Sequence, residues 1–230
     1  ETFRVAHELE SACKGFIEDQ YQKSSGDSDI DPVKIGSFAI SKLTGKNIAF
    51  SKNASISLWE SKRTEKGFAF MEGGKNIEID PDNFSSNDYT DKNMVNELMI
   101  LNEIYKNNKS INYIINSNSA WVNVLSHAET KLLPLLDDFA QIAGTSVKTT
   151  EMNPKEAVKA LNKSSAVLLK QKGALCCGIS RDDALAVSMV LEKNCMAYIT
   201  AALLGRIKPI DFLECKLMRF VYLNKYSKLR

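Results

Sequence analysis

The order of extended and helical segments limits the possible folds of this chain more strongly than any other feature. Between residues 36 and 79, short segments rich in β-forming residues are separated by turn signals such as Thr44–Gly45 and Gly73–Gly74. From Lys92 onward, helical patterns alternate with short apolar strands. This order predicts one α/β domain over residues 1–230, a single-domain α/β/α sandwich with a mixed, largely antiparallel central sheet.

The boundaries follow from the hydrophobic spacing and the turn residues. A β-meander is predicted from segments at residues 36–43, 47–51, 55–59, 67–71 and 75–79. Further strands are predicted at residues 112–115, 166–170 and 174–177. Helices are predicted at residues 2–22, 92–107, 120–125, 129–143, 154–162, 180–204 and 210–226.

Composition excludes several classes of function. The formal net charge of +2 is too small to indicate a nucleic-acid partner. No apolar run approaches the ~18 residues of a membrane span, and no signal-peptide core is visible. We therefore expect a cytoplasmic protein without nucleic-acid or membrane partners. The chain has two histidines, His7 and His127, too few for a three-histidine metal cage.

Glu97 does not match the face of the helix on which it is predicted to lie. With Met94 at zero degrees and about 100° per residue, an apolar arc contains Leu98, Leu101 and Tyr105. Glu97 falls inside this arc. An ionised carboxylate there is costly unless it is paired, so an unpaired one is expected to keep its proton. Either Glu97 reaches water at the edge of the arc, or it is an acid/base group positioned in a cleft.

Several motifs around this helix keep a characteristic spacing. Glu97 in its Val-Asn-Glu sequence is followed by Tyr105, by the strand that ends at 116–118, by the turn at 171–173 and by a long helix with Glu192. This arrangement resembles the class II aldolase and adducin family. In those enzymes a Ser-Ser-Glu sequence supplies a catalytic carboxylate, followed by a tyrosine, a His-x-His strand end, an Asn-His-Gly turn and a helix with a glutamate. The resemblance implies the aldolase fold and a homo-oligomer, since family enzymes are commonly tetramers.

The positions of the family's metal ligands are changed in this chain. Three imidazoles hold a zinc-type ion in the family, and the ion stabilises the enediolate formed when a sugar-phosphate C–C bond breaks. Asn116, Asn118 and Lys172 stand at those positions here. Amide oxygens are poor zinc ligands, and an ammonium group repels the ion. We therefore expect no metal and no other cofactor.

The family's phosphate-binding segments are also altered. Ser37, Lys52 and Asn96 stand near the positions that the family uses for phosphate, but most of the hydroxyl and glycine N–H donors are gone. These three residues, together with Asn116 and Asn118, remain candidates for binding a phosphorylated sugar or another small anion. For Lys52, an ordinary exposed lysine is the alternative.

The replacement by Lys172 suggests an electrostatic substitution. Loss of a buried dication would leave the Glu97 carboxylate without a partner, and the Lys172 ammonium could supply the missing positive charge. We expect a buried pair held by the amide oxygens of Asn116 or Asn118, with a cost of roughly 3–5 kcal/mol when it is broken. The alternative is a turn lysine that lies on the surface.

Three hypotheses for function follow. The first is a domain without zinc-dependent aldolase activity that acts in binding or assembly, like the metal-free adducin members of the family. The second is a metal-independent aldolase or isomerase for a carbonyl sugar phosphate, in which Lys172 forms a Schiff base and Glu97 transfers protons. The third is an aldolase part of a longer fusion protein, because the sequence does not begin with methionine and family domains can be fused to dehydrogenases.

Overall fold

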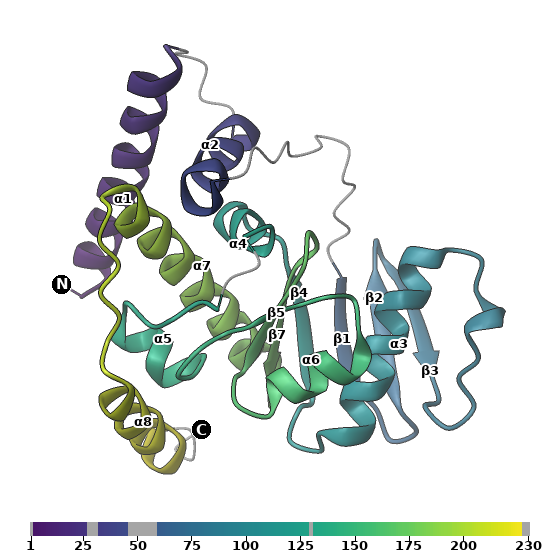
Figure 1. Cartoon of the computed structure of the whole chain (residues 1–230). Helices are drawn as coiled ribbons and strands as arrows, with labels where there is room; N and C mark the ends of the chain where they lie inside the picture. Colours follow the sequence, from purple (N-terminus) through teal and green to yellow (C-terminus); the bar gives the residue numbers. More distant parts are fainter. Residues whose placement is uncertain (1, 27–31, 46–58, 129–130, 227–230) are drawn as a thin grey trace.

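A seven-stranded sheet forms the centre of the computed structural model, which describes residues 2–26, 32–45, 59–128 and 131–226. The strand order is β3-β2-β1-β4-β7-β6-β5 (Figure 1). Neighbouring strands are antiparallel except β5 and β6, which are parallel. The strands are β1 (Trp59–Arg63), β2 (Phe68–Glu72), β3 (Lys75–Ile79), β4 (Tyr113–Ser117), β5 (Thr149–Thr150), β6 (Ala166–Leu169) and β7 (Gly173–Gly178).

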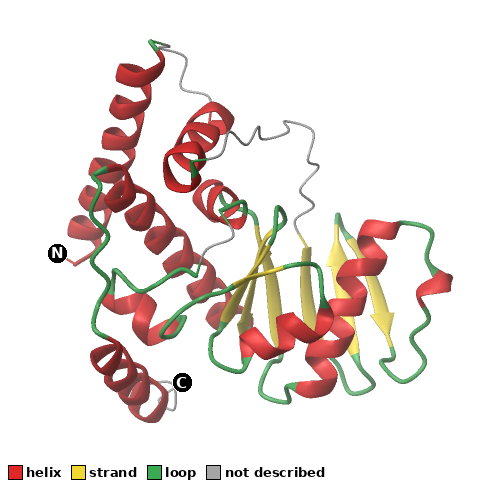
Figure 2. Ribbon diagram, in the orientation of Figure 1, coloured by secondary structure: helices red, strands yellow, loops and turns green. Residues whose placement is uncertain are grey.

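Helices cover both faces of the sheet (Figure 2). The helices α3 and α6 pack on one face, whereas α4 and α7 pack on the other and are joined there by α1 and α2. The helical elements are α1 (Thr2–Ser25), α2 (Pro32–Thr44), η1 (Ser86–Asp88), α3 (Lys92–Asn107), α4 (Ala120–Ser126), α5 (Asp137–Ile142), α6 (Pro154–Leu161), α7 (Arg181–Leu203), α8 (Phe212–Val221) and η2 (Tyr222–Tyr226). This arrangement confirms the predicted α/β sandwich with a mixed, largely antiparallel sheet.

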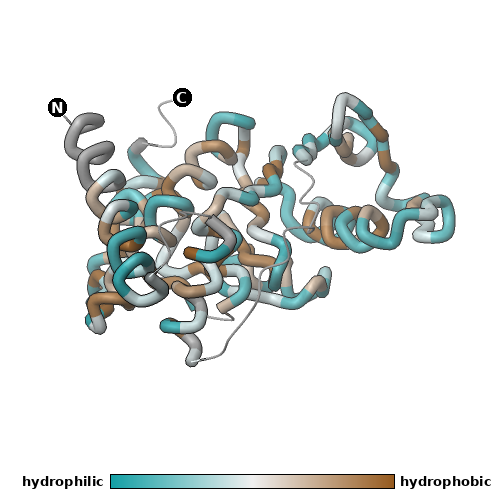
Figure 3. The backbone as a smooth tube through the Cα atoms, turned by 90° about the horizontal axis from the view of Figure 1, so that it is seen from above, coloured by the Kyte–Doolittle hydropathy of each residue, from teal (hydrophilic) through white to brown (hydrophobic). Residues whose placement is uncertain are grey.

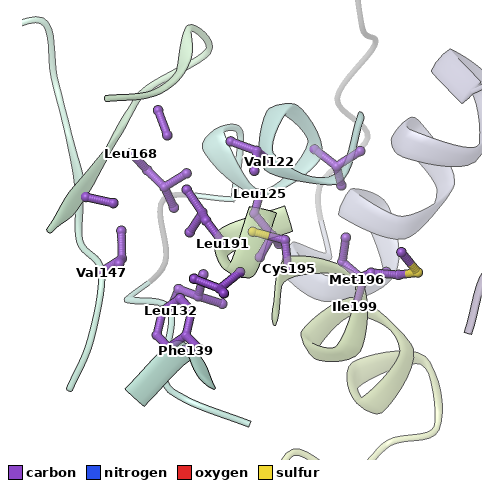
Figure 4. Packing of buried hydrophobic residues seen from close by; sticks show 14 of the residues in the cluster. Val122, Leu125, Leu132, Phe139, Val147, Leu168, Leu191, Cys195, Met196 and Ile199 are labelled. Atoms are coloured by element: carbon purple, nitrogen blue, oxygen red, sulfur yellow. The ribbon is translucent and has the colours of Figure 1, made fainter. Parts of the chain in front are cut away.

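The sheet separates two hydrophobic cores. Alternate residues of β6 point to opposite faces: Val167 and Leu169 join the core under α3 and α6, and Ala166 and Leu168 join the core under α4 and α7. Because both faces are covered, the strand is apolar throughout. Figure 4 shows the second core, where side chains of α4 and α7 meet Leu168.

Capping residues define the two helices that matter most for the candidate site. Asp91 caps α3 by accepting hydrogen bonds from the backbone N–H groups of Asn93 and Met94. Ser180 caps α7, and its hydroxyl also donates to the Asp183 carboxylate. The predicted helices at 92–107 and 180–204 are confirmed because strong caps coincide with helical apolar spacing.

The first segment of the predicted meander is a helix. Residues 36–43 were expected to form a strand because they contain several β-forming residues, but they lie within α2. Pro32 stands at the start of α2, and Ile35 and Ala39, four residues apart, are both buried. The segments 47–51 and 55–58 lie outside the described residues. The strands β1, β2 and β3 do form an antiparallel meander.

Two other predicted helices are shorter than expected. Of residues 131–143, only 137–142 are helical, because Leu132 pairs with Val147 as an isolated β-bridge. The Asn194 side chain then holds the next stretch extended by accepting from the Leu135 N–H and donating to the Leu133 carbonyl. The last helix is regular only up to Val221, and a π-helical turn follows it.

Apolar and polar stretches alternate along the backbone (Figure 3). No helix in the described part of the chain is long and apolar enough to cross a membrane.

Candidate functional site

Three side chains form a row across the sheet beneath α3. Trp59 of β1 pairs with Glu72 of β2, and the adjacent register of β1 and β4 places it opposite Asn116. Paired residues of antiparallel strands project from the same face. Trp59 belongs to the core beneath α3, so Glu72 and Asn116 also lie on this face. The three residues line a cleft of about 540 Å³.

Glu97 lies on α3 above this row. Its neighbours Leu98 and Leu101 are fully buried, and Glu97 is half-buried, as its place in the apolar arc predicted. Burial raises the pKa of the Glu97 carboxyl from its ordinary value to about 7. The Trp59 indole N–H and the Lys172 ammonium act in the opposite direction, while the Glu72 carboxylate adds to the rise. Glu97 therefore changes protonation near neutral pH, as an acid/base group requires.

The Trp59 indole has an unusual environment. Trp59 is 2% exposed, and its N–H lies close enough to the Glu97 carboxylate to lower the pKa of that group. Nevertheless, its nitrogen makes no hydrogen bond of normal geometry with any described residue. A buried donor without a full partner is costly, so this N–H can accept a better partner if one enters the cleft.

The Tyr105 side chain is part of the core beneath α3. It stacks on Phe68 with ring centroids 5.0 Å apart, and the Arg63 guanidinium lies 4.8 Å from its ring centroid. Burial raises the pKa of the Tyr105 phenol well above its ordinary value. The phenol is therefore neutral at physiological pH, and the ring belongs to the core beneath α3.

The turn between β6 and β7 brings Lys172 to the first turn of α3. Its Nζ lies 3.5 Å from Oδ1 of Asn93, and the Lys172 side chain is exposed. No ion pair within 4.0 Å joins it to Glu97, although its charge still lowers the pKa of Glu97. The expected buried pair is therefore wrong. Lys172 thus lies at the rim of the site, beside Asn93, which stands one turn before Glu97 on α3.

Asn118 packs against the same turn. A Cβ atom added at Gly173 would lie 2.2 Å from Oδ1 of Asn118, so the two residues are in direct contact. Neither polar atom of the Asn118 amide has a hydrogen-bond partner among the described residues, although both are buried. Asn116 is also buried. Asn116, near the end of β4, and Asn118, just after it, thus lie beside the turn that carries Lys172.

The other candidate binding residues do not join this group. Asn96 precedes Glu97 but is exposed on α3. Ser37 lies on α2, which packs against α4 and α7 on the opposite side of the sheet from α3. Lys52 lies outside the described residues. Sequence reasoning missed Trp59, Glu72 and Asn93, because strand register and the folded turn alone bring them to Glu97.

Glu192, which is far away in the sequence, stabilises the loop after β4 by direct hydrogen bonds. Its carboxylate accepts hydrogen bonds from the Ser119 hydroxyl and from the backbone N–H groups of Trp121 and Val122, 3.2 and 3.0 Å away. An acidic group at a helix N-terminus caps the free N–H groups. Glu192 of α7 therefore caps α4 and positions the segment that follows Asn118.

Replacement of Glu192 by glutamine tests this capping role. The Glu192→Gln variant keeps one acceptor oxygen but loses the charge, so the free energy of unfolding should fall by about 1 kcal/mol. Urea unfolding followed by circular dichroism measures the change. Glu156→Gln, at an exposed position in the first turn of α6, is the matched control. Equal losses in the two variants would contradict a special role for Glu192.

The exposure of Lys172 predicts a small effect of its removal. An exposed lysine with a weak polar contact contributes less than about 0.5 kcal/mol, so Lys172→Ala should unfold at nearly the same urea concentration as the parent. Lys170→Ala is the control, since Lys170 forms an exposed ion pair of 2.7 Å with Glu151. If Lys172→Ala alone lowered the free energy of unfolding by about 3 kcal/mol, the hypothesis of a buried pair between Lys172 and Glu97 would be supported after all.

The donor set around this site differs from that of a metal centre. Within the described ranges, no group of three or more His, Cys, Asp and Glu side chains could hold a metal ion. The candidate groups at this end of the sheet are the carboxamides of Asn116 and Asn118, the Lys172 ammonium and the Glu97 carboxyl, with a pKa of about 7. This set does not fit a zinc-type ion, which is bound by imidazole, thiolate and carboxylate.

Comparison with known proteins shows the family of the chain. Solved structures that the chain resembles include an L-fuculose 1-phosphate aldolase, with 18% identity and a TM-score of 0.57 over 83% of this chain and 93% of that chain. An L-fuculose 1-phosphate aldolase from Glaciozyma antarctica has 18% identity and a TM-score of 0.57 over 80% of this chain and 78% of that chain. An l-fuculose-1-phosphate aldolase from Thermus thermophilus has 16% identity and a TM-score of 0.54 over 74% of this chain and 97% of that chain. At these identities the likeness shows the fold alone. A search of curated proteins found no significant match. Residues 38–199 match the sequence profile of the class II aldolase and adducin N-terminal domain. The chain belongs to the class II aldolase and adducin family.

Proposed function

We propose that this chain is a class II aldolase-like domain that binds a small ligand or acts in assembly, without zinc-dependent cleavage of a sugar phosphate. The donor set at the end of β4 carries this proposal. From the spacing of the family's motifs we place Asn116, Asn118 and Lys172 at the positions of its metal-binding histidines. Amide oxygens bind zinc poorly and an ammonium group repels it, so the electron sink of a metal-dependent aldolase would be missing.

Cobalt binding tests the loss of the metal site. Cobalt(II) in a protein site gives visible absorption bands, and we expect none when the parent protein is titrated with the ion. The triple variant Asn116→His, Asn118→His and Lys172→His should bind cobalt(II) at one ion per chain, if these positions correspond to the family's three histidines as proposed. Stoichiometric binding to the parent protein would overturn the proposal. No binding to the triple variant would contradict the placement of the three residues.

A small polar ligand suits the groups that line the site. The Asn118 amide and the Trp59 indole N–H lack full hydrogen-bond partners among the described residues, and Glu97 can donate a proton near pH 7. Hydroxyl or carbonyl groups could pair with these three, while Lys172 at the rim could attract a phosphate. A phosphorylated sugar or another small anion is therefore the proposed ligand class.

Calorimetry with dihydroxyacetone phosphate tests this ligand class. We expect measurable binding that weakens about 10-fold in Lys172→Ala, through loss of the phosphate contact, and in Asn118→Leu. Lys155→Ala, at an exposed position on α6, is the control and should bind like the parent. Binding that is unchanged in both site variants would contradict a phosphate site at this position.

The pKa of Glu97 also supports an alternative function, a metal-independent aldolase or isomerase. In that case Lys172 would attack the carbonyl carbon of a sugar phosphate, water would leave, and Glu97 would transfer the protons. A Schiff-base lysine is normally activated by burial, whereas Lys172 is exposed. Borohydride reduction with dihydroxyacetone phosphate separates the functions: a stable adduct on Lys172 supports the enzyme, and an unmodified Lys172 supports the binding domain.

A further inference from the structure

Helix α8 is attached to the rest of the protein by an arginine that points inward. The Arg219 guanidinium donates to the Gln141 carbonyl at 2.6 Å and to the Ser165 hydroxyl at 2.7 Å. It also donates to the carbonyl of Ile142 at the C-terminal end of α5. Cys215, one turn before Arg219 on the same side of α8, is buried. These contacts fix which side of α8 faces α5, at one end of the molecule (Figure 1).

The opposite side of α8 is apolar and exposed. Leu213, Leu217 and Phe220 are 72%, 63% and 64% exposed, and their spacing of four and three residues places them in one stripe. We call these three residues the outer stripe. An ordinary surface helix turns its apolar side inward and its charges outward, whereas α8 turns Arg219 inward and the outer stripe outward. A contiguous apolar surface of this kind marks an interaction site.

Exposed apolar side chains are concentrated on this segment. Of the twelve large apolar side chains that are exposed in the described ranges, six lie between residues 212 and 223. The other six are distributed among α3, α7 and the segments that flank α7. Single exposed apolar residues are normal on a protein surface, but half of them on one short segment are not.

The C-terminal segment is also the basic part of the chain. From Asp211 to Arg230 it carries five Lys and Arg against two Asp and Glu, whereas the other 210 residues carry 25 against 26. The two acids, Asp211 and Glu214, stand at the start of α8, where Asp211 accepts hydrogen bonds from backbone N–H groups and the helix dipole offsets part of their charge. The segment that exposes the outer stripe therefore carries an excess of positive charge.

Two lysines of the described part of this segment border the apolar side chains. At about 100° per residue, Lys216 lies at one edge of the outer stripe. Its ammonium lies 4.6 Å from the ring centroid of Phe212, which is itself 55% exposed. Lys225 follows in the exposed π-helical turn. Apolar side chains flanked by long basic ones are typical of helices that lie in the interface of a membrane, where the ammonium groups reach the level of the phosphates.

Anionic lipid fits this surface better than other partners. A second copy of the chain would bring two basic segments together, and their charges would repel each other. A nucleic acid would pair with the lysines but would leave the outer stripe without an apolar partner. A lipid surface supplies both anionic headgroups and acyl chains. The sequence predicts no membrane partner because no apolar run could span a bilayer, but a helix that lies on the surface needs no such run.

We propose that α8 binds the surface of a membrane that contains anionic lipids, with the outer stripe among the acyl chains and Lys216 and Lys225 at the headgroup phosphates. Arg219 holds α8 against α5, so the stripe is already formed on the folded protein and binding does not have to order the helix first. The position of α8 at one end of the molecule lets it approach a flat surface (Figure 1). This proposal does not rest on the ligand or the metal content of the cleft.

Flotation of the full chain with lipid vesicles tests the apolar contact. We expect the parent to bind vesicles of phosphatidylcholine and phosphatidylserine more strongly than vesicles of phosphatidylcholine alone. Leu217→Gln removes an apolar side chain without changing the charge and should weaken binding about 10-fold. Leu204→Gln should leave binding unchanged, because Leu204 is also 63% exposed but lies outside α8. Circular dichroism checks that both variants are folded.

Two further sets of variants test the charges and the depth of insertion. Lys216→Gln and Lys225→Gln should each weaken binding to the phosphatidylserine vesicles about 5-fold at low salt, whereas Lys155→Gln, at an exposed position on α6, should bind like the parent. The fluorescence of Phe220→Trp should shift to shorter wavelength when these vesicles are added, because the new indole leaves water. The parent protein, measured in the same way, gives the contribution of its own tryptophans.

Four results would overturn the proposal. They are a parent that does not bind the phosphatidylserine vesicles, a parent that binds both kinds of vesicle equally, binding that Leu217→Gln leaves intact, and an unshifted emission of Phe220→Trp. Sedimentation without lipid covers the remaining alternative. An oligomer of the parent that Leu217→Gln dissociates would assign the outer stripe to a second copy of the chain and would also overturn the membrane contact.

Discussion

Replacement of Gly173 by alanine should reduce the free energy of unfolding by about 4 kcal/mol, the largest effect that we expect from any single change in this protein. Gly173 has a φ angle of +83°, which costs other residues about 1–2 kcal/mol. In addition, the new Cβ would lie 2.2 Å from Oδ1 of Asn118 and 2.4 Å from the carbonyl oxygen of Ser117. The turn or the end of β4 must move to relieve this overlap. Urea unfolding measures the loss.

Gly74 provides the matched control for this prediction. Its φ angle is +79°, nearly the same as that of Gly173, but an added Cβ would meet no atom within 4 Å. Gly74→Ala should therefore lower the free energy of unfolding only by the cost of the positive φ angle, about 1–2 kcal/mol. The difference between the two variants isolates the contact between the turn and β4. Equal losses would mean that the turn does not pack against Asn118.

The Glu97→Gln variant should be more stable than the parent at pH 8, by about 2 kcal/mol, and equally stable near pH 4. Burial raises the pKa of Glu97 from 4.5 to about 7 in the folded protein. Between these values the unfolded chain releases the proton that the folded protein keeps, so the stability of the parent falls as the pH rises, and it levels off above pH 7. The difference in pKa corresponds to about 3 kcal/mol, which partial solvent exposure reduces.

Urea unfolding of both proteins from pH 4 to pH 8 measures this difference. Glu78→Gln removes the same charge from an exposed position on β3 and serves as the control. If the difference between Glu97→Gln and the parent is the same at every pH in this range, Glu97 does not titrate near neutrality. The assignment of Glu97 as an acid/base group would then be lost as well.

Elements with strong local signals were predictable from the sequence. The helix at 92–107 has a capping aspartate and a regular apolar arc, and its predicted boundaries are those of α3. The turn at residues 172–173 follows from two apolar strands around a glycine. By contrast, residues 36–43 contain β-forming residues but lie in a helix, because packing against α4 and α7 outweighs the weak intrinsic preference.

The sequence by itself determined the α/β class, the family frame and the position of Glu97 in an apolar arc, because helical periodicity and motif spacing are local properties of the chain. Only the tertiary structure decided that Trp59 and Glu72 lie beneath Glu97 and that Lys172 contacts Asn93 at the rim. Strand register and the path of a turn depend on contacts between residues far apart in the chain. For the same reason, only the tertiary structure decided that helix α8 turns Arg219 toward the carbonyl groups of Gln141 and Ile142 in α5.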